Sequence, residues 1–259
     1  MSPEAGERSI TGRPLLAASA LGWVTLILAV NSSALPQLCS FAVPTALSVR
    51  LVPDRALIEL ALVLNPPARL AGGWALMVAA MMLPLQLAPV RHIRVRSFAR
   101  RRLRAIALFL AGYAAIWLAA GAVLVSLALL LRLDFADSVG LLVGGVMLAA
   151  VWQASPLKQL CLNRCHDRPA LAAFGRAADR DALVFGLTQG WWCFGAGWAL
   201  MLLPLLVAQG HLWVMAGVGL WLAGERFDAP RRPEWGWRGP GKGLRIVQAQ
   251  VRSLSAARG

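Results

Sequence analysis

The sequence predicts an all-α, polytopic membrane protein with six transmembrane helices and both termini in the cytoplasm. The first observation is composition. The 259 residues are 58% hydrophobic and only 15% charged, with a mean hydropathy of +0.62, whereas soluble domains are nearer half apolar and a quarter charged. The second is that apolar runs of about 20 residues recur along the chain, and each is long enough to cross a hydrocarbon core of ~30 Å.

The basic residues set the predicted orientation. Of the 26 lysines and arginines, Arg50, Arg55, Arg69 and Arg132 lie in the loops predicted to be outside, and the other 22 lie in the segments predicted to be inside. Because cytoplasmic segments carry the excess of Lys and Arg, we expect a multi-pass protein of the bacterial inner membrane. The net charge of +14 then reflects contact with anionic lipid heads, and we expect no binding to nucleic acid.

The six predicted helices divide the chain into a cytoplasmic N-terminus (1–14), a membrane domain (15–225) and a basic cytoplasmic tail (226–259). They span Leu15–Val30, Leu70–Val90, Leu103–Leu131, Ser138–Ser155, Asp181–Val207 and Ala208–Glu225. Arg91–Arg104 and Arg168–Arg180 are predicted to be basic cytoplasmic loops. In the second helix, Pro84 removes a backbone hydrogen bond and predicts a kink. In the fourth helix, Gly140, Gly144 and Gly145 allow a neighbouring helix to approach closely.

The segment around the first helix has an alternative reading. It resembles a signal peptide cleaved near Ser32-Ser33-Ala34, but we favour a retained helix because a polytopic chain needs no cleavage. Further along, Leu57–Leu64 is apolar but too short to span, which predicts a segment at the membrane interface or against the bundle. Cys39 has no second cysteine nearby and is interpreted as a small buried residue.

A pair of cysteines marks the candidate site. Pro156 fits the first position of a short helix that follows the fourth one, and such a helix places Cys161 and Cys165 at i,i+4 on one face. The predicted topology puts both thiols on the reducing side of the membrane. Metal binding by thiolates is therefore favoured over a structural disulfide.

Three further sulfur-bearing residues complete the candidate site. Cys193 lies about midway along the fifth helix, and Met81 and Met82 precede Pro84 at a comparable depth. We expect Cys161, Cys165, Cys193 and Met81 or Met82 to converge near the cytoplasmic half of the bundle, with the second, fourth and fifth helices as neighbours. Thiolate and thioether ligands suit copper(I) better than they suit hard cations.

The motifs together resemble a bacterial family of predicted metal-binding integral membrane proteins, over roughly residues 15–226. The matching residues are Trp74, Met77 and Ala80-Met81-Met82-Leu83-Pro84; Gly112-Tyr113 and Trp117; Gln153, Pro156-Leu157-Lys158, Cys161-Leu162, Cys165 and Pro169; Gly190, Cys193, Gly195 and Trp198-Ala199-Leu200-Met201; and Trp213, Met215 and Glu225-Arg226. Where this family commonly has a histidine, the chain has Gln189, and where the family has paired cysteines, the chain has Ala196-Gly197.

Two functions follow as alternatives. The first is a protein that handles copper(I), with Cys161, Cys165 and Cys193 as thiolate donors and Met81 and Met82 as thioether donors. His166 is a further candidate donor, although a histidine in a basic loop is more often solvated. The second is a structural or assembly subunit that packs on a partner membrane complex and has lost the metal site. The sequence contains no Gly-rich phosphate loop and no HExxH motif, and we expect no enzyme.

Overall fold

The computed structural model describes residues 3–31, 55–134, 138–207, 210–237, 239, 241 and 249, and the regular elements in these ranges are all helical. Cys39, Arg50 and the alternative cleavage site at 32–34 lie outside them. In chain order the elements are α1 (Pro3–Asn31), α2 (Arg55–Leu64), α3 (Pro67–Met82), η2 (Pro84–Gln86), α4 (Leu87–Arg96), η3 (Ala99–Arg101), α5 (Arg102–Asp134), α6 (Ser138–Ala154), α7 (Pro156–Arg164), α8 (Gly175–Leu206) and α9 (His211–Glu225).

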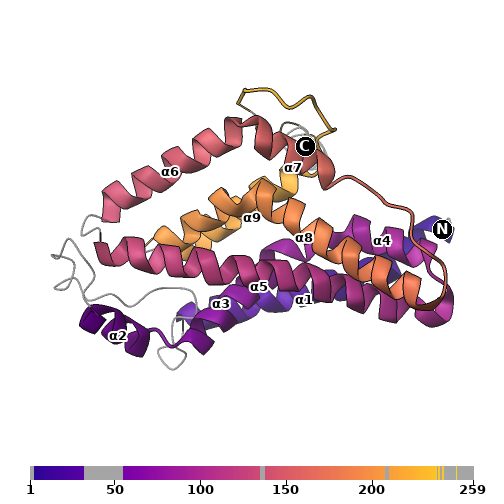
Figure 1. Ribbon diagram of the computed structural model, residues 1–259, viewed down its shortest axis with the longest axis horizontal. Coiled ribbons are helices and arrows are strands. Elements are labelled where there is room, and N and C mark those ends of the chain that lie inside the picture. Colours follow the sequence, from indigo (N-terminus) through magenta and orange to yellow (C-terminus); the bar gives the residue numbers. More distant parts are fainter. Residues whose placement is uncertain are drawn as a thin grey trace, which may run out of the picture.

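The two long helices α5 and α8 lie side by side along the molecule (Figure 1). Glycines make this approach possible. A Cβ atom at Gly186 would lie 2.1 Å from the carbonyl oxygen of Phe109, and one at Gly112 would lie 2.6 Å from that of Leu183. The predicted glycines of α6 are less important, because nothing lies within 4 Å of a Cβ at Gly144, although Gly145 does pack on Leu206 of α8.

Prolines divide two of the predicted helices. The axis bends by 50° between α3 and the segment that begins at Pro84, as the sequence predicts, and by 67° between α6 and α7. Pro156 occupies the start of α7, and Ser155 caps it by accepting a hydrogen bond of 3.2 Å from the backbone N–H of Lys158. The cap and the proline together restart the chain in a new direction.

The expected packing of the three predicted helices is only partly correct. α6 packs on α8 as expected, whereas α3 packs mainly on α1, α5 and α9. α6 and α3 lie on opposite sides of the molecule (Figure 1). The reason is the aromatic contact between α3 and α5, in which Trp74 Nε1 donates a 2.6 Å hydrogen bond to the carbonyl oxygen of Trp117. Met81 is buried, so the expectation that it faces away from lipid holds.

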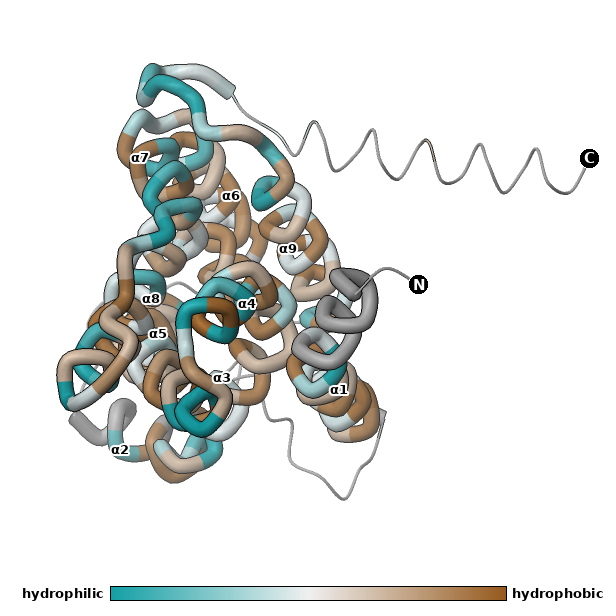
Figure 2. Tube along the Cα trace, turned by 90° about the vertical axis from the view of Figure 1, so that its right-hand side faces the viewer, coloured by the Kyte–Doolittle hydropathy of each residue, from teal (hydrophilic) through white to brown (hydrophobic). Residues whose placement is uncertain are grey.

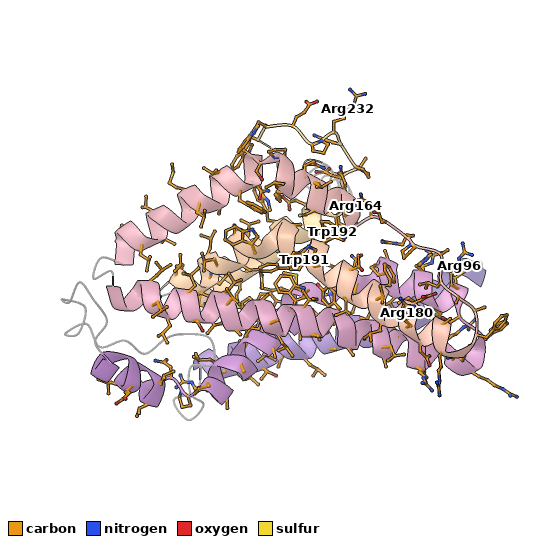
Figure 3. All side chains as sticks on the ribbon, in the orientation of Figure 1. Arg96, Arg164, Arg180, Trp191, Trp192 and Arg232 are labelled. Carbon is orange, nitrogen blue, oxygen red and sulfur yellow. The ribbon has the colours of Figure 1, made fainter. Side chains whose placement is uncertain are left out.

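The segment before the fifth predicted helix is not all loop. α8 begins at Gly175 and so includes Arg176 and Arg180. One turn into the helix, Asp179 accepts ion pairs of 2.7 Å from both Arg101 and Arg104. An acidic partner for two arginines of the neighbouring basic segment stabilises the additional helical turns. Arg96 and Arg180 lie at the same end of the molecule (Figure 3).

Helix length and hydropathy identify fewer membrane spans than the sequence predicts. Within the described residues, Gly12–Ala29 and Ala99–Arg132 are long and apolar enough to cross a membrane, and counting each bent helix pair as one span gives up to four. α9 has 15 residues, or about 22 Å at 1.5 Å per residue. Hydrophobic residues are frequent along α1, α5 and α6 (Figure 2). Leu21, Val123 and Val139 in these helices are all more than 60% exposed.

Candidate functional site

The candidate site lies where α7, α8 and the end of α9 meet. α7 packs on α8, and this contact brings Cys165, which follows the last residue of α7, towards the middle of α8. The carbonyl oxygen of Cys165 accepts a 3.3 Å hydrogen bond from Gln189 of α8 and a 3.1 Å hydrogen bond from Arg168. Cys165 and Cys193 are each only 2% exposed.

Arg226 joins the two thiols. It follows the last residue of α9, and its Nη2 lies 2.9 Å from the sulfur of Cys193. Its guanidinium also hydrogen-bonds the thiol of Cys165. On the other side of Cys193, the hydroxyl of Tyr113 lies 3.2 Å from the sulfur. Two thiols from different helices therefore contact one cation.

Cys161 lies beside this pair but has a different environment. It is half-buried, and its sulfur lies over α8, where a Cβ at Gly195 would be 2.6 Å from it. It precedes Cys165 by four residues on the same helix face, close enough to influence the charge state of that thiol. The predicted i,i+4 arrangement of the two cysteines is therefore present, with one thiol buried and the other partly accessible.

The structure separates the two methionines. Met82 lines a small cavity together with Leu85, Cys193 and Arg226. Met81 instead packs on α9, where a Cβ at Gly219 would lie 3.7 Å from two of its side-chain atoms. Successive residues of a helix point about 100° apart, so only one of the two can face the cysteines. Met82 is that residue, and Met81 is part of the core.

His166 is a structural contact in this conformation. Its Nδ1 lies 2.9 Å from the carbonyl oxygen of Leu162, and its Nε2 lies 3.3 Å from that of Arg226. Among the described residues, no three His, Cys, Asp or Glu side chains are arranged to hold a metal ion. The soft donors that do lie together are Cys165, Cys193 and Met82, with Cys161 adjacent.

Sequence reasoning missed a buried ion pair next to these donors. Glu225, the last residue of α9, accepts hydrogen bonds from Lys158 and Gln153, and a third of 2.9 Å from Trp221. Lys158, Gln153 and Glu225 are each at most 4% exposed. All but Trp221 belong to the motifs of the family resemblance, and a lysine in the apolar face of a short helix was the signal that could have revealed the pair.

The electrostatics of the site keep its cation charged and its buried thiol neutral. Burial raises the pKa of the Cys165 thiol to about 12, although the Arg226 guanidinium acts in the opposite direction. Burial opposes the charge on Arg226, but Cys165 and Cys193 favour it, so the pKa of this guanidinium lies above its ordinary value. A metal ion that binds these sulfurs must displace their protons, because thiolates are the ligands.

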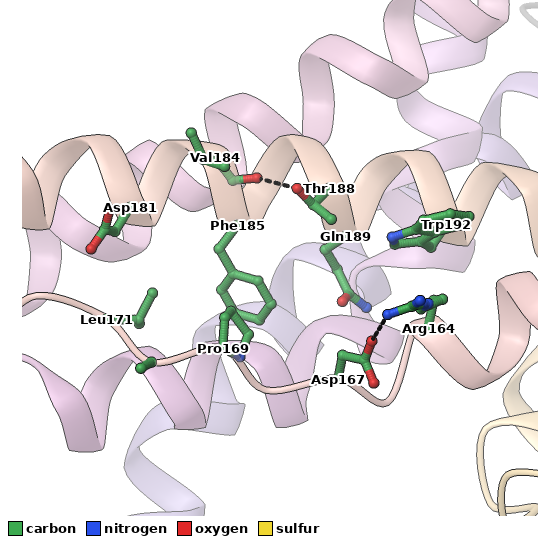
Figure 4. A pocket seen from close by; sticks show the side chains of 11 residues that line it. Arg164, Asp167, Pro169, Leu171, Asp181, Val184, Phe185, Thr188, Gln189 and Trp192 are labelled. Atoms are coloured by element: carbon green, nitrogen blue, oxygen red, sulfur yellow. Dashed lines mark hydrogen bonds and ion pairs between the residues drawn. The ribbon is translucent and has the colours of Figure 1, made fainter.

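A larger cavity lies beside Gln189. Its volume is about 500 Å³, and Gln189, Trp192, Arg164 and Asp167 are among its lining residues (Figure 4). Gln189 lies at the position where the family resemblance expects a histidine. Its hydrogen bond to the Cys165 carbonyl shows that a side chain at this position adjoins the site.

The comparisons with known proteins give one match. Residues 71–249 match the PpoB2 family, which is described as a copper chaperone family. This range begins in α3 and contains Met82, all three cysteines of the site and Arg226. No curated protein matches the chain, and no solved structure matches it.

Proposed function

We propose that this chain, which belongs to the PpoB2 copper chaperone family, binds copper(I) between the sulfurs of Cys165 and Cys193. The observation that carries the proposal is the meeting of two buried thiols from α7 and α8 at one guanidinium. Copper(I) is the cargo of this site. We propose no catalytic role, in keeping with the expectation from the sequence.

The residues present fit the chemistry of copper(I). Cys165 and Cys193 supply soft thiolates, and Met82 on the wall of the same cavity supplies a thioether, which is the ligand set that copper(I) prefers. The neighbouring carboxylate of Glu225, which lines the same cavity, is engaged by Lys158 through its Oε1. Cys161, half-buried and one turn away, is placed to exchange the ion with a partner.

We place the protein in the bacterial inner membrane, with six crossings and both termini in the cytoplasm. The support is the distribution of Lys and Arg in the sequence, the two spans identified by length and hydropathy, and the apolar outer surface of α6, on which Val143, Met147 and Val151 are exposed. α7 and the candidate site then face the cytoplasm, beside anionic lipid heads.

A second candidate is a non-catalytic assembly subunit of a membrane complex that no longer binds metal. Ala196 favours it, because this residue lines the cavity with Cys193 and Arg226 at a position where the family resemblance expects a cysteine. Gly197 faces α9 instead, where a Cβ would meet Leu222 at 3.4 Å. The lost cysteine at 196 is therefore the one that would have joined the site.

Anaerobic titration of the purified full chain with copper(I), against a chromophoric copper(I) chelator, tests the proposal. We expect one copper ion per chain, and a loss of affinity of at least about 100-fold in Cys165→Ser and in Cys193→Ser, since each removes a direct ligand. Met82→Leu is expected to weaken binding and Met81→Leu, its matched control, to leave it unchanged. A wild-type chain that binds no copper would favour the assembly subunit.

A further inference from the structure

We propose that Arg226 makes the site selective for a monovalent ion by supplying a fixed positive charge next to the two thiolates. This inference rests on the proposed copper site and adds to it a residue that discriminates copper(I) from divalent zinc. Arg226 is not a ligand, and it acts through the charge that it places at the sulfurs.

Arg226 is held in place from several directions. Its backbone N–H donates to the carbonyl oxygens at the end of α9, with 3.2 Å to that of Ala223, and its own carbonyl oxygen contacts His166. The preceding residue, Glu225, is fixed by Lys158. The chain after Arg226 is tied to α7, since Asn163 donates a 2.6 Å hydrogen bond to the carbonyl oxygen of Arg231. These contacts fix the backbone at Arg226 and so hold its guanidinium next to the thiols.

The charged groups near Arg226 include Arg168, whose positive charge interacts with Arg226 and with Cys165. Lys158 and Glu225 neutralise each other in the buried ion pair. On the surface, Asp167 pairs with Arg164 at 3.3 Å. The groups whose ionised forms favour the charge on Arg226 are the thiols of Cys165 and Cys193 and the hydroxyl of Tyr113.

The expected preference for copper(I) over zinc(II) follows from the charges of the ion, the two thiolates and Arg226. Two thiolates carry two negative charges, and Arg226 and copper(I) together carry two positive ones, so these four charges cancel. Zinc(II) in place of copper(I) leaves one positive charge of this set unbalanced, in addition to that of the nearby Arg168. A net charge enclosed by apolar residues is costly because it has lost its hydration, and the cost falls on the divalent ion alone.

The experiment measures copper(I) and zinc(II) affinities by chelator competition in the full-length wild type, Arg226→Gln and Arg226→Lys. Arg231→Gln is the matched control, because the Arg231 side chain is exposed and only its backbone makes the contacts to Asn163. We expect Arg226→Gln to lower the ratio of copper to zinc affinity by at least about tenfold, since it removes a desolvated countercharge. Lysine should restore most of the ratio, and Arg231→Gln should not change it.

The results separate the two proposals. If the wild type binds copper(I) but Arg226→Gln keeps the wild-type ratio, or if Arg226→Lys loses as much as Arg226→Gln, this inference is wrong and the copper site stands. If the wild type binds no copper(I), both fail.

A measurement on the wild type covers the case in which Arg226→Gln does not fold. Silver(I) and mercury(II) both bind two thiolates and differ in charge. We expect silver(I) to preserve, and mercury(II) to reduce, the protection of residues 222–230 against hydrogen exchange, because the extra charge repels Arg226. Equal protection with both ions would contradict the inference.

Discussion

Two charged clusters lie next to each other at the end of α9, and their charges are balanced differently. In the first, Lys158 and Glu225 form a buried ion pair that Gln153 and Trp221 complete. In the second, the guanidinium of Arg226 contacts the thiols of Cys165 and Cys193. The first cluster is closed in the sense that its two charges balance each other, and it holds α6, α7 and α9 together. The second gains its balancing charge only when the thiols lose their protons.

The comparison indicates where a ligand can act. In the ion pair, Lys158 already balances the charge of Glu225, although Oε2 of this carboxylate has no hydrogen-bond partner among the described residues. A cation beside two thiols favours any event that turns them into thiolates. The pairs of Arg101 and Arg104 with the partly buried Asp179 near the surface provide a third case, in which solvent partly screens the charges.

Breaking the closed cluster should have the largest effect on stability. Lys158→Met leaves the Glu225 carboxylate buried without its cation, and we expect a loss of about 3–5 kcal/mol in the free energy of unfolding. The double variant Lys158→Met/Glu225→Gln should recover most of this loss, because no buried charge remains. Unfolding in detergent, followed by tryptophan fluorescence, measures both. A single variant as stable as the double would show that the pair is not closed as described.

The second cluster should make stability depend on pH. The folded Cys165 thiol holds its proton up to about pH 12, while the unfolded thiol releases it near pH 9.0. The folded state thus binds more protons in this window, and the free energy of unfolding falls as the pH rises through it. Cys165→Ser removes this contribution. Between these pH values, the free energy of unfolding should therefore fall more steeply with pH in the wild type than in Cys165→Ser. Equal slopes would count against the burial of the thiol.

A single methyl group should disturb the contact between α5 and α8, which also places Tyr113 beside Cys193. Gly186→Ala forces the helices apart, since the new Cβ would lie 2.1 Å from the Phe109 carbonyl oxygen, and we expect a loss of about 1–3 kcal/mol. Gly144→Ala is the matched control in open space, and it should stabilise its helix by up to about 1 kcal/mol. Thermal unfolding of the two variants compares them. Equal effects would mean that the two helices do not depend on this close approach.

The smallest effect is expected at the surface pairs. Asp179→Asn removes both ion pairs with Arg101 and Arg104, and the free energy of unfolding should fall by no more than about 1 kcal/mol because solvent screens these charges. Added salt should reduce the difference further. A loss as large as that of Lys158→Met would remove the distinction between buried and surface pairs.

The sequence alone determined the helical class and the local breaks of this protein. Pro84 and Pro156 mark real bends because a proline cannot donate the backbone hydrogen bond that a continuing helix requires. The spacing of Cys161 and Cys165 likewise predicted their shared face, since an α-helix has 3.6 residues per turn. Membership of a copper-related family agrees with the metal chemistry that these sulfurs suggested. Each of these conclusions depends on residues close together in the chain.

Only the tertiary structure decided which distant residues meet. It selected Met82 over Met81, placed α3 against α1, α5 and α9, and brought Arg226 to Cys193 across 33 residues of chain. It also paired Lys158 with Glu225, two charges that look unrelated in the sequence. The physical reason is the same in each case. Burial and charge compensation depend on which helix faces are pressed together, and a sequence pattern specifies the face of each helix but not the neighbour that covers it.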